Sequence, residues 1–552
     1  MIFRKSFKIF FIIILFSGIT NLYSQVESIY IYHPVYKFLF QLENYGLTGK
    51  YNLNDLPLKR NDIVNILKFA RQNINKLSAN EIKTLEIYEN EFEIVNNGNN
   101  TVLIESNSDS TQILFSNLFS NKEKYIFLYR DSSFNTRLRP IGSVDLLFSK
   151  NDSIEFRNAL IGNLGFRFSG TIDNSVGYNL QATNGVLLSG NREIAYLDPK
   201  YSKNIKFVYY QSDIDFTESH INYKNNWFTA SIGRESRLLG TGFLNRMIVS
   251  DNSPAFDALS LTGEFPGFKY KFMHSSLLGF VNQHGTWQTG FGITIPSKYL
   301  AIHRFSLLPS WGEISFWETI VYSDRPMDLA YLNPLSFLKS LEHALRDRDN
   351  AGMGLDLTVR FLDRFQLKGS YFLDDVRFEM IGKNYWGNKS AFNIGLSSSL
   401  PYGLNAGIEY SRVEPFTFSH FNRQNSMVND GFLFGTSVMP NSDKFSLFLN
   451  WWFCERYPLE LEISYLRHGR NIYDNDGNII KNVGGDPLIT KEPEHSGEVT
   501  FLDGDVLYMT SIDLKTAYEL VRGFNLVFNY KVSVSNDFTN QFIRLILRFD
   551  EF

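Results

Sequence analysis

The sequence predicts an all-β transmembrane barrel with a small N-terminal α-helical bundle. Three observations predict this fold class. Apolar and polar residues alternate with a period of two through most of the 552 residues, the chain ends in three such runs, and it begins with a secretory signal. Successive side chains of a strand point to opposite faces, so each run has one apolar and one polar face.

The C-terminal residues show the alternation most clearly. Apolar and polar residues alternate in the runs 507–520, 526–534 and 543–549, and Arg522-Gly523 is a tight-turn signal between the first two. A soluble sandwich would bury the apolar face against a second sheet, whereas an outer-membrane barrel would turn it toward lipid. The strand length, the aromatic residues on the apolar face and the terminal Phe552 favour the barrel. The aromatic residue in phase with the apolar face is Phe549.

The composition fits a barrel and excludes other classes. The mean hydropathy of −0.18 excludes a helical membrane protein, because only alternate residues of a barrel face lipid. The 50 Phe and 29 Tyr suit aromatic girdles at two membrane interfaces. A net charge of −4 argues against a general nucleic-acid binder. The single cysteine, Cys454, cannot form an intrachain disulfide, and we interpret it as structural.

Residues 1–24 predict a signal peptide. Arg4, Lys5 and Lys8 precede an apolar stretch over 9–16, which is too short to span a membrane as a helix. We expect cleavage near Ser24 and export to the outer membrane of a Gram-negative bacterium.

Residues 25–100 predict a periplasmic helical plug domain. Apolar residues at helical spacing from Pro34 to Asn44 and from Ile63 to Ala70 predict two helices. The capping box Ser78-Ala79-Asn80-Glu81 predicts a third. We identify no chemistry in this domain. Residues 101–136 are a linker with the first barrel segments, and residues 137–552 are the outer-membrane barrel.

The alternation gives roughly sixteen to twenty strands. Counting back from the C-terminus places 521–523 on the periplasmic side and the long segment 467–505 outside. Two loops of medium length, 374–389 and 413–430, then fall on the periplasmic side, where turns should be short. We therefore expect that this count misses one strand between Phe432 and Tyr465.

Two irregular stretches interrupt the strand pattern and supply the candidate binding residues, because binding groups tend to lie on irregular segments held by a rigid scaffold. The first stretch contributes Arg234, Arg237, Arg246, Asp251, Asn252 and Asp257. The second, 331–350, predicts a short helix followed by Arg348, Asp349 and Asn350. Arg pairs with carboxylates and Asn or Asp with hydroxyls, so these residues predict a polysaccharide-binding site. Alternatively, both stretches are barrel loops or inward plugs held by salt bridges.

The C-terminal strands place four cations in the lumen phase, namely Lys515, Lys531, Arg544 and Arg548. They could form a positive wall for an acidic polymer or take part in ordinary lumen salt bridges.

We predict no catalytic residue, no metal site and no cofactor. The glycines at 233–242 lack the ending and the following helix of a phosphate loop. No acidic partner can be assigned to His274 from the sequence. Asp474-Asn475-Asp476-Gly477 resembles part of a calcium loop, but Ile472 and Val483 occupy positions that need acids, so a solvated turn is favoured.

Several short stretches resemble one known family. The stretches 34–39, 56–63 and 77–81 are similar to the start of Wzi-type capsule assembly proteins. The stretches 233–257, 331–334, 348–350 and 440–443 are similar to that family's recurring barrel segments. The Gly240-Thr241-Gly242 turn departs from the family, because it lacks the Trp and Pro of that position.

The resemblance implies a monomeric outer-membrane barrel of about eighteen antiparallel strands, plugged on the periplasmic side by the helical bundle. It also implies a lectin that binds capsular or extracellular polysaccharide and helps to anchor or assemble the capsule. The expected partners are outer-membrane lipid and this polysaccharide, with no nucleic acid. Two alternatives remain: a porin or solute channel, and a purely structural surface protein. A plugged lumen predicts negligible conductance.

Overall fold

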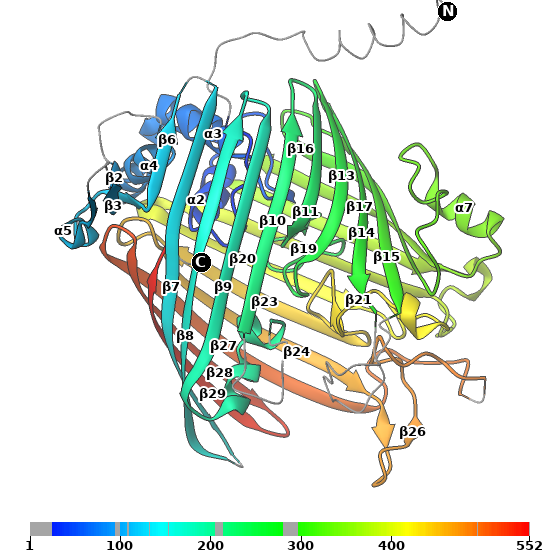
Figure 1. Ribbon diagram of the computed structural model, residues 1–552. Helices are drawn as coiled ribbons and strands as arrows, with labels where there is room; N and C mark the ends of the chain where they lie inside the picture. Colours follow the sequence, from blue (N-terminus) through cyan, green and yellow to red (C-terminus); the bar gives the residue numbers. More distant parts are fainter. Residues whose placement is uncertain are drawn as a thin grey trace, which may run out of the picture.

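The computed structural model describes residues 25–93, 100–106, 110–131, 133–152, 154–204, 214–279, 296–493 and 495–550. The predicted signal peptide and Phe552 lie outside these residues. Within them, eighteen antiparallel strands close a barrel, and helices occupy one of its ends (Figure 1). The predicted fold class is therefore confirmed.

The barrel strands follow one another around the wall in chain order. They are β7 (Phe134–Asn151), β8 (Ile154–Ile172), β9 (Val176–Gly190), β10 (Ile214–Lys224), β11 (Phe228–Glu235), β13 (Phe256–Phe265), β14 (Phe268–Leu278), β15 (Ser297–Leu307), β16 (Gly312–Ser323), β17 (Asn350–Phe361), β18 (Phe365–Asp375), β19 (Lys389–Leu400), β20 (Leu404–Val413), β23 (Ser442–Trp451), β24 (Leu459–Arg470), β27 (Asp505–Val521), β28 (Phe524–Ser535) and β29 (Thr539–Phe549). Pairing of β29 with β7 closes the barrel, and β6 (Phe127–Arg130) pairs antiparallel with residues 135–138 of β7.

The remaining elements are short. They are β1 (Asp55–Leu56), η1 (Ile74–Lys76), β2 (Asn100–Val102), β3 (Ile104–Ser106), β4 (Thr111–Ile113), α5 (Phe115–Leu118), β5 (Glu123–Tyr125), η2 (Arg192–Leu197), α6 (Pro199–Ser202), β12 (Leu238–Leu239), α7 (Leu338–Ala344), η3 (Phe378–Met380), η4 (Pro401–Gly403), η5 (Arg423–Asn425), β21 (Val428–Asn429), β22 (Phe432–Leu433), β25 (Ile472–Tyr473) and β26 (Ile479–Lys481).

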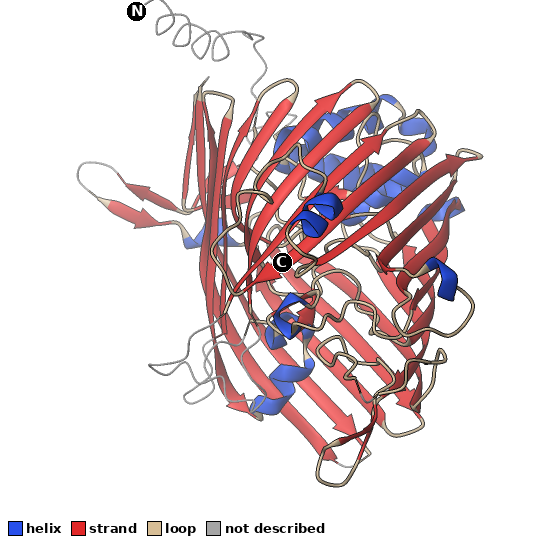
Figure 2. Cartoon of the chain, turned by 90° about the vertical axis from the view of Figure 1, so that its right-hand side faces the viewer, coloured by secondary structure: helices blue, strands red, loops and turns tan. Residues whose placement is uncertain are grey.

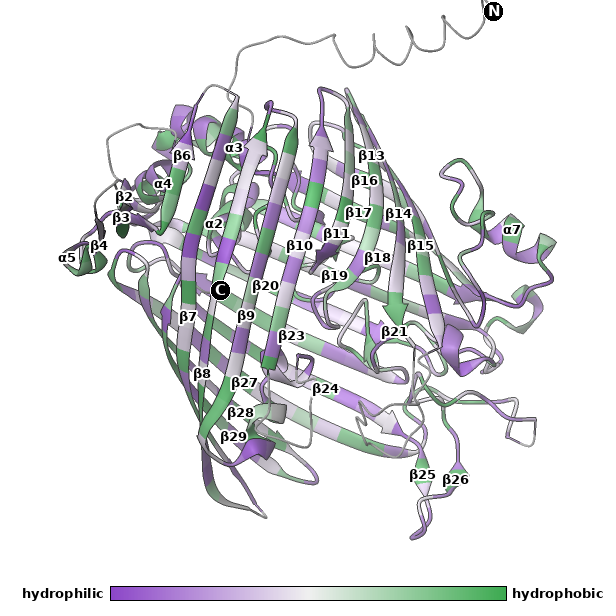
Figure 3. Cartoon of the chain, in the orientation of Figure 1, coloured by the Kyte–Doolittle hydropathy of each residue, from purple (hydrophilic) through white to green (hydrophobic). Residues whose placement is uncertain are grey.

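The predicted alternation sorts side chains between the two sides of the wall (Figure 3). On β29, Leu545 and Leu547 are exposed on the outer face, whereas Arg544 and Arg548 line the lumen. Cross-strand partners share a face, so exposed apolar residues continue from strand to strand, as in Phe305 and Leu355, which both neighbour Phe316. A continuous apolar outer face is what the lipid around a barrel requires.

The two ends of the barrel differ in the length of their connections. At the end that holds the helices, which we call the helical end, neighbouring strands are joined by turns such as 225–227, 266–267 and 522–523. At the opposite end, which we call the loop end, long connections such as 324–349, 414–441 and 471–504 join the strands.

This topology resolves the conflict in the strand count. Connections 376–388 and 414–441 lie at the loop end, together with 471–504. Two barrel strands, β23 and β24, lie between Phe432 and the long loop, separated by the turn 452–458. The expectation of a missed strand in this region is confirmed.

Three helices fill the helical end, namely α2 (Val35–Asn44), α3 (Arg60–Gln72) and α4 (Ala79–Glu91). The capping box is present, because Ser78 accepts from the Glu81 N–H and the Glu81 carboxylate accepts from the Ser78 N–H at 2.7 Å. Their apolar stripes meet in one core, which also takes in Trp452 from a barrel turn. No helix of the described chain is both long and apolar enough to cross a bilayer.

Buried ion pairs fix the helices to the barrel wall. Lys368 contacts Glu43 at 2.9 Å, Lys224 contacts Asp62 at 2.8 Å, and Arg456 contacts Glu91 at 3.3 Å. Burial opposes ionisation of Asp55, but Lys269 and Lys271 outweigh it and lower the pKa of Asp55. Buried charges need such partners, so the helices depend on matching wall residues around the barrel.

Two loop-end connections fold into the lumen and form what we call the inner core. Within 236–255, β12 pairs with β1 of the helical segment. This connection contacts 414–441, where Ser250 donates from its N–H to the Phe434 carbonyl at 2.7 Å. Apolar side chains of the two connections pack on lumen-facing wall residues. The connections contribute Ile248, Val249, Val428 and Phe434, and the wall contributes Met273, Ile302, Trp317 and Phe372.

A third connection, 324–349, lies on the outside of the wall, and we call it the outer cover. Its Tyr331 and Leu338 pack on Ala301, Ile320 and Ala351. These wall residues are on the face opposite the inner core. Figures 1 and 2 show α7 beside the strands, outside the barrel. The interpretation of this stretch as an inward plug is wrong, because its apolar residues pack on the outward face of β15–β17.

Candidate functional site: a charged cavity in the lumen

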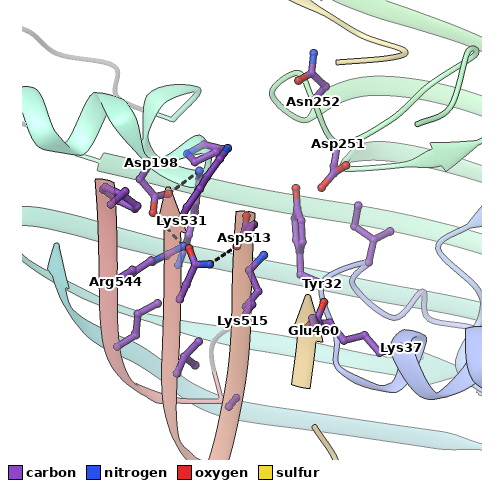
Figure 4. A pocket seen from close by; sticks show the side chains of 18 of the residues that line it. Tyr32, Lys37, Asp198, Asp251, Asn252, Glu460, Asp513, Lys515, Lys531 and Arg544 are labelled. Carbon is purple, nitrogen blue, oxygen red and sulfur yellow. Dashed lines mark hydrogen bonds and ion pairs between the residues drawn. The ribbon is translucent and has the colours of Figure 1, made fainter. Parts of the chain in front are cut away.

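A cavity of about 740 Å³ lies in the lumen, between the helical segment and the wall formed by β24, β27, β28, β29 and β7 (Figure 4). Pro34 and Lys37 line it from the helical segment. Asn540 and Gln541 line it next to the loop-end turn 536–538. The cavity therefore runs from the loop end toward the helices. Its volume falls within the roughly 300–1,000 Å³ of most ligand pockets.

Cations outnumber acids in the lining. The cationic residues are Lys37, Lys200, Lys203, Lys515, Lys531, Arg544 and Arg548, and the acidic residues are Asp198, Asp251, Glu460 and Asp513. A lumen lined by an excess of one sign of charge attracts ligands of the opposite sign.

Lys515 and Lys531 are the accessible cations of the wall. They lie on the neighbouring strands β27 and β28, where their cross-strand partners are Asn529 and Asp513. Both side chains are exposed to the cavity. In the part of the chain that the structure describes, no hydrogen bond or ion pair joins either ammonium group to another residue. Glu460 is opposite Lys515 on β24, but its carboxylate binds Lys37 instead.

The other two lumen cations are anchored. Arg544 contacts Asp145 at 3.1 Å and Asp198 at 3.0 Å. The guanidinium group of Arg548 lies 6.0 Å from the ring centre of Tyr457. All four cations that the alternation placed in the lumen phase line the cavity. Arg544 acts as the expected salt bridge, and the two lysines fit the expected positive wall.

Aromatic rings and a third lysine stand on the other side of the cavity. Tyr30 and Tyr32 contact each other edge to face at 5.0 Å, and Tyr30 contacts Phe216 at 5.7 Å. Lys203 donates to the Tyr32 hydroxyl at 3.2 Å and to the Asp251 carbonyl. Burial lowers the pKa of Lys203 and raises the pKa of Tyr32.

Asp251 and Asn252 are the two sequence-predicted binding residues that line this cavity. They lie at the end of the 236–255 connection. The Asn252 side-chain amide donates to the Leu433 carbonyl at 2.8 Å, which fixes it against the other inner-core loop. Figure 4 shows Asp251 and Tyr32 across the cavity from Lys515 and Lys531.

The other residues of the first predicted cluster lie elsewhere. Arg237 is buried and donates to the carbonyls of Glu235 and Phe256 at 3.0 and 3.1 Å. Arg246 is also buried and donates to the Gly240 and Leu53 carbonyls. Arg234 and Asp257 form an exposed ion pair at 2.6 Å on the outer face of the wall, in phase with the exposed Ile232.

The second predicted cluster lies at the base of the outer cover. Asp349 is buried, contacts Arg325 at 2.7 Å and accepts from the Tyr331 hydroxyl at 2.8 Å. Asn350 donates to the Asn425 carbonyl at 2.9 Å. Arg348 is half exposed, 3.7 Å from Asp328. The structure therefore does not bring the nine residues together, and their joint role in binding stays a prediction.

Sequence reasoning did not single out Tyr30, Tyr32 and Lys203. The aromatic pair precedes Pro34, with one residue between its members, and lies outside the helical pattern of this segment. A turn in which the His33 N–H donates to the Tyr30 carbonyl at 2.9 Å brings the two rings together, and the sequence pattern did not predict this turn. Nothing in the local sequence of Lys203 indicates its contact with Tyr32.

The described chain contains one group of possible metal ligands and the turn that resembles part of a calcium loop. Ligand atoms of Glu342, His343 and Asp347 lie within 4.8 Å of one another, with His343 and Asp347 exposed. In the β25–β26 turn, the Asp474 carboxylate accepts from the backbone of Asp476 and from Asn478. The first feature is a partly exposed acidic group, and the second is a turn held by its own hydrogen bonds. We assign no metal to either.

The fold and the lumen define a β-barrel of the outer-membrane type with a helical segment packed into one end. No family model and no curated protein matches the sequence. Among solved structures, the chain resembles Wzi, an outer-membrane protein involved in group 1 capsule assembly in Escherichia coli and a carbohydrate-binding β-barrel. The identity is 12%, the match covers 96% of this chain and 100% of that one, and the TM-score is 0.56.

Other outer-membrane barrels are more distant. Acinetobacter baumannii OccAB4 and Pseudomonas aeruginosa OprD each have 11% identity and match 75% of this chain, with TM-scores of 0.43 and 0.41. The matches cover 97% and 94% of those chains. At such identities a likeness establishes the fold alone, and at that level the resemblance to Wzi expected from the motifs is confirmed.

Proposed function

We propose that this chain binds an acidic surface polysaccharide, capsular or extracellular, in its lumen cavity and helps to hold or assemble it at the cell surface. The observation that carries the proposal is the pair of unpaired ammonium groups, Lys515 and Lys531, facing aromatic rings across one cavity. The likeness of the fold to a carbohydrate-binding barrel supports it.

The lining supplies the groups that sugar recognition needs. Sugar rings stack on aromatic faces, and their hydroxyls pair with polar side chains. Tyr30 and Tyr32 offer the rings, and Asp251 and Asn252 offer hydroxyl partners. Ammonium groups pair with the carboxylates of uronic acids through charge-assisted hydrogen bonds. An acidic oligosaccharide segment therefore fits the cavity better than a neutral one.

The orientation follows from the connections. Barrels of this type have short periplasmic turns and longer external loops, so the helical end faces the periplasm and the loop end faces outside. The cavity then opens toward the side where a surface polymer lies. The proposal further includes that the chain is a monomer, is exported by its signal peptide and has no enzymatic activity.

A solute channel is the second candidate, because a charged lumen also suits small ions. The packed helices and the inner core favour binding over passage. Planar-bilayer recordings separate the two functions. A binding barrel gives negligible conductance, whereas sustained open-channel current would favour the channel.

The binding test uses the purified full chain in detergent and a panel of acidic and neutral polysaccharides. Removing a charged hydrogen bond typically costs about 1.5–3 kcal/mol. The double variant Lys515→Ala with Lys531→Ala should therefore lower the affinity for acidic ligands at least about tenfold. Lys68→Ala, an exposed lysine on α3, is the matched control and should leave binding unchanged. Equal affinity of the double variant and the control for every acidic ligand would refute the proposed site.

A further inference from the structure

The outer cover lies over polar side chains that point out of the barrel. His274 is 4% exposed, His303 0% and Glu318 1%, although all three are on the outward face of β14–β16. The Nδ1 atom of His303 lies 3.2 Å from the Glu318 carboxylate, and His274 contacts the Tyr322 hydroxyl at 2.8 Å. Ionisable groups that face lipid are costly, so this part of the wall needs a cover.

The cover closes over these groups through direct contacts. The Leu338 N–H donates to the Glu318 carboxylate at 3.0 Å, and the Asp328 N–H donates to the Tyr322 hydroxyl at 3.1 Å. The Tyr270 hydroxyl, also on the outward face, donates to the Pro334 carbonyl. The inner side of the cover thus satisfies outward-facing polar groups of two strands, β14 and β16.

The other side of the cover exposes large apolar residues. Leu335 is 89% exposed and Leu329 82% exposed, and Met327 and Phe337 are exposed beside them. Four such residues within eleven positions form an apolar patch, and its exposure to water is unfavourable.

This patch continues the apolar belt of the barrel. Next to the cover, Phe305, Ile314 and Leu355 are exposed on the same outward face. On β16 only Ile314 and Phe316 remain uncovered, which spans about 7 Å of strand, whereas a bilayer needs an apolar band of about 25 Å. Figure 1 shows the cover beside the wall, between the two ends of the barrel. The patch supplies the missing height of the belt.

The charged part of the cover lies toward the loop end. Arg346, Asp347 and Arg348 are exposed and lead directly into Asn350, the loop-end residue of β17. Charged side chains near the ends of a membrane segment reach the headgroup layer, while apolar residues occupy the hydrocarbon.

We propose that the outer cover is a lipid-immersed element. Leu329, Leu335 and Phe337 insert into the hydrocarbon of the bilayer around β14–β17, and 346–348 lie at the headgroups. The cover replaces a polar section of wall with an apolar one. The occupant of the exposed patch is lipid, and its continuity with the exposed wall residues is the reason for choosing lipid over a protein partner.

The experiment places an environment-sensitive fluorophore at single cysteines of the full chain in lipid vesicles. The background carries Cys454→Ser, and the test sites are Leu329→Cys and Leu335→Cys. Ile512→Cys, exposed in the middle of β27, is the lipid control. Ile480→Cys, a similarly exposed apolar residue of the β25–β26 hairpin, is the water control. Quenching by lipid-borne spin labels and by a water-soluble quencher is compared at all four sites.

We expect both test sites to match Ile512→Cys, with strong quenching from lipid and several-fold protection from the aqueous quencher. Test sites that match Ile480→Cys would overturn the proposal while leaving the barrel in the membrane. Protection from both quenchers would indicate a protein partner and would also overturn it. Aqueous quenching at Ile512→Cys itself would instead refute the membrane placement. None of these outcomes depends on polysaccharide binding.

Discussion

The two halves of this barrel have the same alternating wall but differ in what lies against its lumen side. In the half formed by β24, β27, β28, β29 and β7, the lumen side borders the charged cavity. In the half formed by β13–β20, the lumen side is covered by the inner core and part of the outer side by the outer cover. We call them the cavity half and the filled half.

The connections explain the difference. In the cavity half, the loop-end turn 536–538 between β28 and β29 is too short to reach into the lumen. The filled half has long connections that carry apolar residues, such as Ile248 and Phe434, and these pack on wall residues. Alternation along a strand therefore builds the wall, and loop length with loop hydrophobicity decides whether the lumen is a core or a binding cavity.

The largest expected effect is on the stability of the filled half. Trp317 is fully buried and stacks on Phe372 with ring centres 5.5 Å apart. Trp317→Ala should cost about 3–5 kcal/mol of unfolding free energy, because it leaves a cavity in a packed core. Val527→Ala, at a residue that borders the cavity of the cavity half, should cost clearly less. Urea unfolding of both variants measures this, and equal losses would contradict the division into halves.

The second effect is a pH dependence of stability in the cavity half. Burial opposes ionisation of Glu93, but Arg137 of β7 and Arg60 outweigh it and lower its pKa to about 2. The unfolded pKa is about 4.3. A carboxylate whose pKa is lower in the folded than in the unfolded state stabilises the fold. This contribution is fully present above about pH 5 and is lost as the pH falls through 4 toward 2. It amounts to at most about 3 kcal/mol.

Hydrogen exchange of residues 60–93 between pH 5 and pH 2 measures this contribution. Exchange corrected for its intrinsic pH dependence should increase with acidification in the native protein. Glu93→Gln should remove part of that increase, whereas Glu86→Gln, an exposed carboxylate on α4, should not. A Glu93→Gln profile identical to the native one would show that this ion pair does not hold the helices.

A smaller effect is expected from the aromatic side of the cavity. Tyr32→Ala removes a ring that sugar stacking would use, and it should weaken polysaccharide binding roughly tenfold, since an aromatic contact contributes about 0.5–1.5 kcal/mol beyond its buried area. Tyr32→Phe keeps the ring and loses the hydroxyl that accepts from Lys203, so it should retain most of the affinity. If both variants bind alike, the ring is not a contact.

The smallest effect is expected at Arg234, which the sequence-based hypothesis places in the binding site. Its ion pair with Asp257 is exposed on the outer wall, and exposed pairs contribute about 0–1 kcal/mol. From this position we expect Arg234→Ala to leave both barrel stability and cell-bound polysaccharide nearly unchanged. Folded, heat-modifiable protein and retained polysaccharide should be measured in the same cells. Release of polymer with an intact barrel would support the sequence-based hypothesis instead.

Local sequence patterns were sufficient to predict the barrel wall. A period of two assigns each strand residue to a face, because consecutive side chains of a strand point to opposite sides. It therefore placed Lys515, Lys531, Arg544 and Arg548 in the lumen, and the capping box at Ser78 located the start of a helix for an equally local reason. These predictions rest on neighbours in the chain, and local geometry suffices for them.

The course of the connections depends on contacts between residues far apart in the chain. Residues 233–257 and 331–350 both broke the strand pattern and looked alike as irregular charged stretches. One folds into the lumen and brings Asp251 to the cavity, whereas the other folds over the outside of the wall. No periodicity specifies a direction for a loop. The direction is set by the wall residues that a loop meets: the apolar Met273 and Trp317 inside the barrel, and the polar His303 and Glu318 outside it.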